Sequence, residues 1–125
     1  MNKNTRIMVV DDDELYREVL TTMLHEAGLL VMGVEDGEKA IGIAKYSKPD
    51  LILLDYKMPG INGVETLEHL KKNPLTKSIP VIMLTGAGSR ELVTESTHAG
   101  AADFIVKPSD KVTIVSKIHE VLFST

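Results

Sequence analysis

The sequence predicts a doubly wound α/β domain, in which one parallel sheet carries helices on both of its faces. Five short apolar runs alternate with segments of helical spacing along the chain. The runs lack the polar alternation of a half-exposed strand, and 125 residues are a usual length for one domain. Alternating strands and helices form parallel sheets, and right-handed crossovers between the strands distribute the helices over both faces.

The apolar runs are the predicted strands, and they cover residues 6–10, 29–34, 51–54, 81–84 and 104–106. Because apolar side chains dominate each run, we expect all five strands to be buried on both faces of the sheet. Residues that follow the strands should then meet along one edge, since the carboxyl ends of parallel strands lie together.

The first two helices are predicted from apolar spacing and from residues that favour helix ends. Apolar residues recur every four positions in the first helix, at Leu15, Val19, Met23 and Ala27. Gly28 then supplies its C-terminal stop. Asp36 caps the second helix, which is expected to end before Lys48-Pro49 because a residue that precedes proline disfavours the helical conformation.

The remaining three helices differ in the size of their apolar faces. The third, which ends at Asn73-Pro74, carries Val64, Leu67 and Leu70. The fifth, which Ser109 caps, buries Val112, Val115, Ile118 and Leu122. The fourth runs from Ser89 to Gly100, and its thin apolar face is made by Leu92, Val93 and Ala99. Such a thin face is typical of an element of low local stability.

Composition excludes several classes of function. The apolar fraction of 43% and the charged fraction of 26% are ordinary for a folded globular protein. The absence of cysteine excludes disulfides and zinc–thiolate sites and suits a reducing compartment. A net charge of −4 argues against direct binding to nucleic acid. The early apolar run is too short for a signal peptide or a membrane span, so we expect a cytoplasmic domain without a membrane partner.

Reactive side chains follow four of the five predicted strands. They are Asp11, Asp12 and Asp13 after the first strand, Asp55 after the third, Thr85 after the fourth and Lys107 after the fifth. Carboxylates gathered in this way raise one another's pKa unless a cation lies among them. Oxygen ligands without His or Cys suit Mg²⁺, which leaves room for a phosphate oxygen. Asp55 can also act as a nucleophile, because carboxylates form aspartyl-phosphates.

Four motifs, in order, resemble those of response-regulator receiver domains, the family of the bacterial chemotaxis regulator. They read VVDDD, LILLDYKMPGINGVETL, PVIMLTGAG and ADFIVKP. The resemblance covers essentially the whole chain, so residues 1–125 are interpreted as one receiver domain. It implies a flavodoxin-like (βα)₅ topology with strand order 2-1-3-4-5.

The resemblance also implies how the acids are used. Asp55 would accept the phosphoryl group, and Asp12 and Asp55 would hold Mg²⁺ through their side chains. Asp11 would complete the pocket through a metal-bound water, and Lys57 would add its backbone carbonyl as a ligand. Asp13 stands one place beyond the acid pair of the family, where we expect it to begin the first helix.

The other site residues take their expected roles from the same resemblance. Thr85 would hydrogen-bond the phosphoryl group and Lys107 would pair with it, and the Lys107-Pro108 bond is commonly cis in the family. Phe104 occupies the place of an aromatic residue that changes rotamer between states. Lys57 and Ala87 flank the entrance of the attacking water and are expected to help set the phosphoryl lifetime, although Lys57 also fits a plain exposed lysine.

The function implied is two-component signalling. A sensor histidine kinase or phosphotransfer protein would donate to Asp55, and the face made by the fourth helix, fifth strand and fifth helix would bind a downstream protein or output domain. Phosphorylation could also drive formation of a homodimer. Only self-phosphorylation and self-dephosphorylation are expected, so the chain is not predicted to be an enzyme. A phosphorylation-independent interaction module is the alternative, and the chain fits either a stand-alone receiver or part of a longer regulator.

Other α/β functions fit the residues less well. A haloacid-dehalogenase-type phosphatase needs a second acid two places after the nucleophile, where this chain has Lys57. A flavodoxin-like electron carrier needs a hydroxyl- and glycine-rich loop after the first strand, and aspartates at that place would repel a flavin phosphate. The histidines are His25, His69, His98 and His119, and all four are expected at the surface.

Overall fold

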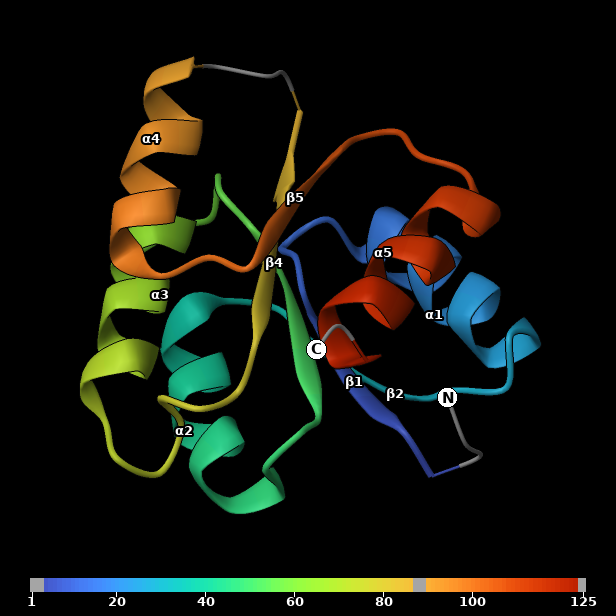
Figure 1. Ribbon diagram of the computed structural model, residues 1–125, viewed down its shortest axis with the longest axis horizontal. Helices are drawn as coiled ribbons and strands as arrows, with labels where there is room; N and C mark the ends of the chain where they lie inside the picture. The colour runs from blue at the N-terminus through green and yellow to red at the C-terminus, as the bar shows by residue number, and fades with distance from the viewer. Residues whose placement is uncertain (1–3, 87–89, 124–125) are drawn as a thin grey trace.

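The structure is a computed structural model that describes residues 4–86 and 90–123, and it contains one five-stranded sheet (Figure 1). The strands are β1 (Arg6–Val10), β2 (Leu30–Val34), β3 (Leu51–Asp55), β4 (Val81–Thr85) and β5 (Asp103–Val106). All paired strands are parallel, and their order is β2-β1-β3-β4-β5. The predicted fold class and strand order are therefore confirmed.

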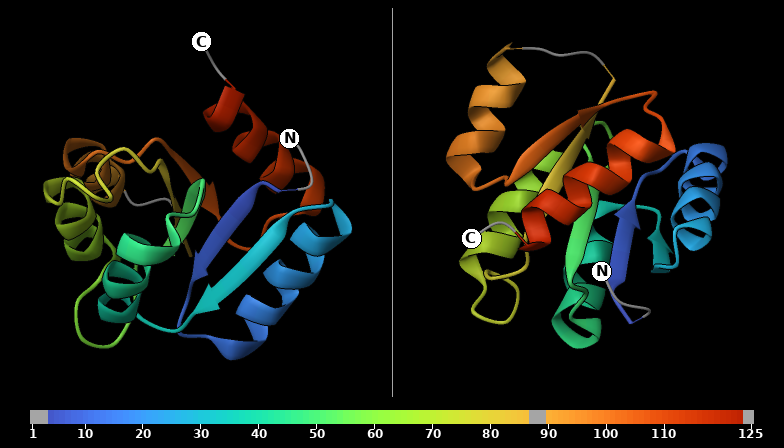
Figure 2. Two further views of the ribbon diagram at one scale, coloured as in Figure 1. Left: turned by 90° about the horizontal axis from the view of Figure 1, so that it is seen from below. Right: turned by 45° about the vertical axis from the view of Figure 1, so that its right-hand side comes forward.

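Helices cover both faces of this sheet, as Figures 1 and 2 show from different sides. One face carries α1 (Glu14–Glu26) and α5 (Lys111–Phe123), and the other carries α2 (Gly37–Ser47), α3 (Gly63–Lys72) and α4 (Arg90–Ala99). Successive residues of a strand point to opposite faces, so Ile7 and Val9 join the core under α1 and α5 while Met8 and Val10 join the core on the other side.

Several helix ends form at the residues that the sequence predicts. Asp13 and Asp36 cap α1 and α2, and each carboxylate accepts the backbone N–H of the residue three positions later. Gly28 follows α1 with a φ of +87°, a conformation that glycine adopts without steric cost. A capping box stabilises the start of α3: the side chains of Asn62 and Glu65 each accept the backbone N–H of the other residue. The sequence analysis did not predict this capping box.

The predicted buried face of α1 is wrong in part. Leu15 is 71% exposed and Val19 is 40% exposed, whereas Leu20 and Leu24 are fully buried. A strict four-residue spacing drifts by about 40° per step around a helix of 3.6 residues per turn. The predicted apolar residues at the N-terminal end of α1 therefore point to solvent, whereas Met23, closer to the C-terminal end, packs against the core.

The start of α5 also differs from the prediction. The cap is Asp110 rather than Ser109, because the Asp110 carboxylate accepts the backbone N–H of Thr113 at 2.7 Å. This hydrogen bond lowers the pKa of Asp110. The helix buries Ile114 and Ile118, and Val115 and Leu122 pack against the same core as predicted, whereas Val112 is 75% exposed.

The prediction that every strand is buried on both faces of the sheet is confirmed for the three central strands and is wrong for the two edge strands. β1, β3 and β4 are almost completely buried, but Leu30 of β2 is 48% exposed and Val106 of β5 is 53% exposed. An edge strand has a neighbour on one side only, so part of its surface reaches solvent. An apolar run does not reveal whether it becomes a central strand or an edge strand.

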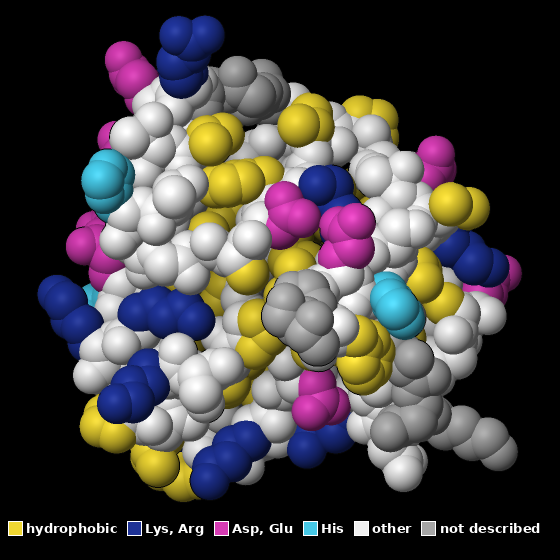
Figure 3. Space-filling view, viewed as in Figure 1, with side chains coloured by type: hydrophobic (Ala, Val, Ile, Leu, Met, Phe, Trp, Pro, Cys, Tyr) yellow, Lys and Arg dark blue, Asp and Glu magenta, His cyan; other side chains and the backbone are white. Residues whose placement is uncertain are grey.

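The thin face predicted for α4 is confirmed. Ser96 is its only fully buried residue, and Leu92, Val93 and Ala99 are half-buried. Gly100 ends the helix with a φ of +105°, whereas Ser89 lies outside the described residues. Figure 3 shows hydrophobic side chains on the surface between α4 and β5. Among the described residues, no helix combines the length and the apolar character needed to cross a membrane.

Candidate functional site

Three acids meet at the carboxyl edge of the sheet. Asp11 and Asp12 follow β1, and Asp55 ends the neighbouring strand β3. Val10 is paired with Leu54, so Asp11 and Asp55 lie side by side at the strand ends. One carboxylate oxygen from each acid lies within 4.8 Å of those of the other two. Asp11 is fully buried and Asp55 is 6% exposed, whereas Asp12 reaches solvent.

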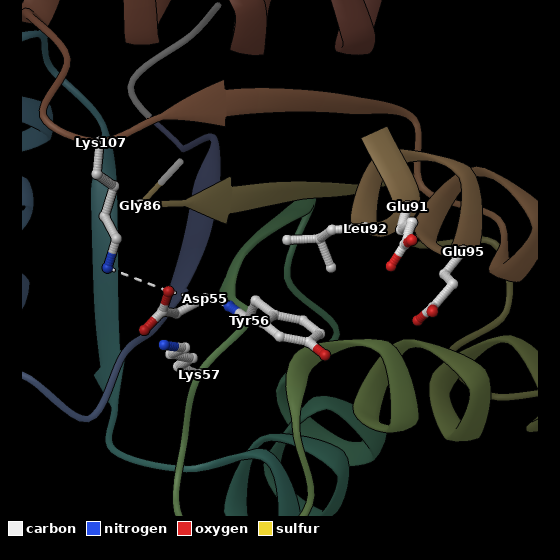
Figure 4. Close-up of a pocket in the computed structure, with 8 residues that line it drawn as sticks. All are labelled: Asp55, Tyr56, Lys57, Gly86, Glu91, Leu92, Glu95 and Lys107. Atoms are coloured by element: carbon white, nitrogen blue, oxygen red, sulfur yellow. Dashed lines mark hydrogen bonds and ion pairs between the residues drawn. The ribbon is translucent and has the colours of Figure 1, made fainter. Parts of the chain in front are cut away.

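Lys107 joins this cluster from the far side of β4. Its Nζ lies 3.0 Å from Oδ2 of Asp11 and 3.1 Å from Oδ1 of Asp55. Figure 4 shows the side chain extending from the end of β5 toward Asp55. The ammonium thus contacts two of the three carboxylates, and its one positive charge cannot offset the three negative charges that the cluster carries when all three acids are ionised.

Burial and the excess of carboxylates over ammonium groups shift the pKa values of both Asp55 and Lys107. Burial, followed by repulsion from Asp11, raises the pKa of Asp55 to about 6, although Lys107 and the Tyr56 N–H oppose the rise. Burial lowers the pKa of Lys107, but its contacts with the two carboxylates outweigh burial and raise that pKa above its ordinary value. Lys107 therefore stays an ammonium at neutral pH, while the charge of Asp55 is poorly stabilised. A bound cation would stabilise it.

Arg17 fixes the loop that carries the first two acids. Its Nη1 donates to the backbone carbonyl of Asp11 at 2.7 Å, and the Asp13 N–H donates to the Asp11 carboxylate at 2.9 Å. The Arg17 side chain lies over Gly33 of β2, where an added Cβ would be 3.1 Å from Arg17 Cδ. Sequence reasoning missed this contact because β2 and α1 touch there only in the folded chain.

Asp55 opens into a cleft of about 450 Å³. Its lining residues, drawn in Figure 4, are Asp55, Tyr56, Lys57, Gly86, Glu91, Leu92, Glu95 and Lys107. Glu91 and Glu95 project from α4 on the side opposite Lys107. Gly86 leaves open space at the end of β4, since none of the described residues lies within 4 Å of a Cβ added there. A small phosphorylated donor therefore has room to approach the carboxylate of Asp55.

The family model described as the response regulator receiver domain matches residues 7–119 of the chain. The chain belongs to this receiver domain family. It is thus a receiver domain of the kind found in two-component response regulators, and the resemblance in its four motifs is confirmed.

Known proteins resemble this receiver domain over nearly its whole length. It is 37% identical to the phosphate regulon transcriptional regulatory protein PhoB of Escherichia coli, over 94% of this chain and 51% of PhoB. The chain therefore spans about half the length of that relative. It is 36% identical to protein PilH of Pseudomonas aeruginosa, over 94% of this chain and 97% of PilH. Among solved structures, chemotaxis protein CheY4 of Vibrio cholerae superposes with a TM-score of 0.91 at 29% identity, covering 95% and 99% of the two chains.

Thr85 lies beside the acid cluster of the receiver domain but not in the lining of the cleft. Thr85 is 1% exposed at the end of β4, one residue beyond Leu84, which pairs with Asp55. Its backbone carbonyl accepts the Lys107 N–H at 2.6 Å and so fixes the base of that side chain. The predicted hydrogen bond from the Thr85 hydroxyl to a phosphoryl group stays a prediction.

The remaining predictions for the receiver site have mixed outcomes. Lys57 is exposed and lines the cleft, and the Lys107-Pro108 bond is cis as predicted. Phe104 is half-buried against the core on the α2 and α3 side, and its rotamer change stays a prediction. Ala87 lies outside the described residues. All four histidines are exposed, as expected.

Proposed function

We propose that this receiver domain accepts a phosphoryl group on Asp55 from a sensor histidine kinase or a phosphotransfer protein. The observation that carries the proposal is the position of the Asp55 carboxylate, which lies in an open cleft and contacts Lys107 at 3.1 Å. Membership of the receiver family supports the choice of donor, because two-component regulators receive phosphoryl groups from histidine kinases. Both proteins would meet in the cytoplasm.

The acid cluster has the donor set for Mg²⁺. Three carboxylates converge within 4.8 Å, no sulfur or imidazole donor takes part, and the ammonium of Lys107 leaves negative charge to be neutralised. The side chains of Asp11, Asp12 and Asp55 and the backbone carbonyl of Lys57 would hold the ion. When bound, it supplies positive charge that offsets the carboxylates and the phosphoryl oxygens.

Each protein group has a defined part in the proposed transfer. One carboxylate oxygen of Asp55 forms a bond to phosphorus while the bond from phosphorus to the donor breaks, and the donor leaves with that electron pair. The Lys107 ammonium then pairs with a phosphoryl oxygen, and the Thr85 hydroxyl donates a hydrogen bond to another. Phosphoryl transfer depends mainly on such positioning and charge neutralisation. Water later cleaves the acyl-phosphate, which restores the Asp55 carboxylate and releases inorganic phosphate, so both steps take place on the domain's own side chain.

The output surface that we propose is the face made by α4, β5 and α5. Ser96 is the only fully buried residue of α4, so few core contacts resist its rearrangement. Hydrophobic side chains lie between α4 and β5 in Figure 3, and Val106 of β5 is 53% exposed. Movement of Thr85 toward the phosphoryl group would let α4 repack, and the changed face would bind a downstream protein, an output domain or a second copy of the domain.

Intact-mass spectrometry after incubation with acetyl phosphate, with and without Mg²⁺, tests the acceptor. We expect one added phosphoryl group in the presence of Mg²⁺ and none in Asp55→Asn. Asp50→Asn is the matched control, because Asp50 is an exposed aspartate at the opposite end of β3. A mass gain that survives Asp55→Asn would place the acceptor elsewhere. No gain in the unaltered protein, with either acetyl phosphate or a panel of histidine kinases, would favour a phosphorylation-independent interaction module.

A further inference from the structure

We propose that Tyr16 is a positioning residue for Lys107 and that its ring face is a third partner of the ammonium. The Nζ of Lys107 lies 4.7 Å from the centroid of the Tyr16 ring, and two carboxylates contact the same atom at 3.0 Å and 3.1 Å. The face of an aromatic ring carries partial negative charge and attracts a cation within about 6 Å. This inference rests on the proposed role of Lys107 in phosphoryl transfer.

The base of the Tyr16 side chain is held by the start of α1. Its backbone N–H donates to the capping carboxylate of Asp13 at 3.1 Å, and the ring packs against the core beneath α1 and α5. Asp13 thus links two residues of the site: its carboxylate accepts the Tyr16 N–H, and its own N–H donates to the carboxylate of Asp11. The same helix start thus places the ring and one of the two carboxylates around Lys107.

The ring face, rather than the phenol hydroxyl, makes the contact with the site. The hydroxyl is buried and has no hydrogen-bond partner among the described residues, so it contributes no polar contact to Lys107. Burial raises the pKa of Tyr16, and the two nearby carboxylates add to the rise while Lys107 opposes it. The side chain therefore stays neutral at physiological pH and attracts the ammonium as an aromatic ring, without the charge of a phenolate.

The ammonium of Lys107 needs a partner that restricts its position, because it lies at the end of a long and flexible side chain. The side chain begins at the end of β5, passes the end of β4 and contacts an acid of β3, and its flexible four-carbon chain has many rotamers. The acid contacts change when Asp55 becomes protonated or phosphorylated. The ring contact is independent of those changes, so Tyr16 keeps the ammonium in the cleft before and after transfer and shields it from water. The Lys107 side chain is only 19% exposed.

Two substitutions at this position separate the ring from the hydroxyl. Tyr16→Phe keeps the ring, and Tyr16→Leu keeps an apolar side chain without it. Tyr46→Leu is the matched control, because Tyr46 lies on α2 and is 88% exposed. In carbon–proton spectra, the ε-methylene protons of Lys107 should show an upfield ring-current shift in the unaltered protein and in Tyr16→Phe, and this shift should disappear in Tyr16→Leu. This measurement does not depend on phosphorylation, so it tests the contact even if the proposed function is wrong.

The rate constant for phosphorylation by acetyl phosphate at saturating Mg²⁺ tests the effect on function. We expect Tyr16→Phe and Tyr46→Leu to keep the unaltered rate and Tyr16→Leu to lose about threefold to thirtyfold, the range that a partly desolvated cation–π contact supports. Pentafluorophenylalanine at position 16 keeps the shape of the ring but reverses its charge distribution, and it should lose as much rate as leucine. An unaltered rate with either replacement, or an equal loss in Tyr16→Phe, would overturn the proposal.

Discussion

Asp55 carries the least favourable charge of the site at the scale of single residues. Its carboxylate is buried beside that of Asp11, and the single ammonium of Lys107 is divided between the two. Burial and repulsion from Asp11 therefore raise the pKa of Asp55 to about 6, so the folded protein holds the proton of Asp55 more tightly than an exposed aspartate does. The residue that is proposed to become phosphorylated is therefore one whose bare negative charge destabilises the fold.

The stability of the metal-free protein should consequently depend on pH through Asp55. Because its folded pKa lies near 6 and its ordinary pKa is 3.8, its contribution to stability is greatest below about pH 4 and is lost as the pH rises through 6. We expect Asp55→Asn to raise the free energy of unfolding by about 2–3 kcal/mol at pH 7 and to change it little at pH 4. Urea unfolding in the presence of EDTA measures both values. A variant that is no more stable than the unaltered protein at pH 7 would contradict this interpretation.

At the scale of elements, close packing of α3 against the end of β3 positions Asp55. The N–H of Gly63, the first residue of α3, donates to the Tyr56 carbonyl at 2.7 Å. A Cβ added at Gly63 would lie 2.4 Å from the Asp55 carbonyl oxygen and 2.9 Å from Met83 Cε. The helix can therefore approach the strand this closely only because residue 63 is glycine.

Alanine substitutions at two glycines should have opposite effects. Gly63→Ala forces α3 away from Asp55 and should lower the free energy of unfolding by about 2–3 kcal/mol, since overpacking strains its neighbours. Gly42→Ala, within the exposed part of α2, should raise it by about 0.5–1 kcal/mol, because a Cβ there meets none of the described residues within 4 Å and alanine favours the helix. Chemical denaturation compares the pair. Equal effects of the two substitutions would show that the close approach at Gly63 is unimportant.

At the scale of the whole molecule, folding creates the acid cluster. Asp11 and Asp55 are far apart in the sequence and become neighbours because β1 and β3 pair in the sheet. β4 lies between β5 and β3, and the long side chain of Lys107 extends past the end of β4 to contact both acids. In the unfolded chain these groups are dispersed, so a divalent cation should bind the folded protein almost exclusively.

Mg²⁺ should therefore stabilise the whole domain. At a concentration one hundred times its dissociation constant, an ion that binds only the folded state adds about 2.7 kcal/mol to the free energy of unfolding. Asp12→Asn should remove most of this gain, and Glu91→Gln should keep it, because Glu91 lines the same cleft outside the acid cluster. Unfolding curves at increasing Mg²⁺ give the comparison. If Mg²⁺ stabilises Asp12→Asn as strongly as the unaltered protein, Asp12 is not a ligand.

Much of this architecture could be predicted from local patterns of residues. The apolar runs predicted the bounds of all five strands to within one residue, and Asp13 and Asp36 predicted two helix starts, because these features depend on neighbours in the chain. Acids after buried strands also indicated the cluster, since parallel strands end at one edge. The predicted faces of α1 and α5 failed at Leu15 and Val112, where the path of the helix over the sheet decides burial.

Local patterns were thus sufficient for the fold class and for the acids and lysine that meet at the sheet edge. Contacts between side chains of different elements depended on packing: Arg17 over Gly33, the ring of Tyr16 beside Lys107, and the exposure of β2 and β5. The apolar patterns that predict strands and helices extend over several residues, so the prediction of an element does not depend on the exact position of any one of them. A contact between two side chains requires both elements at the right distance and rotation, and no single stretch of sequence specifies these.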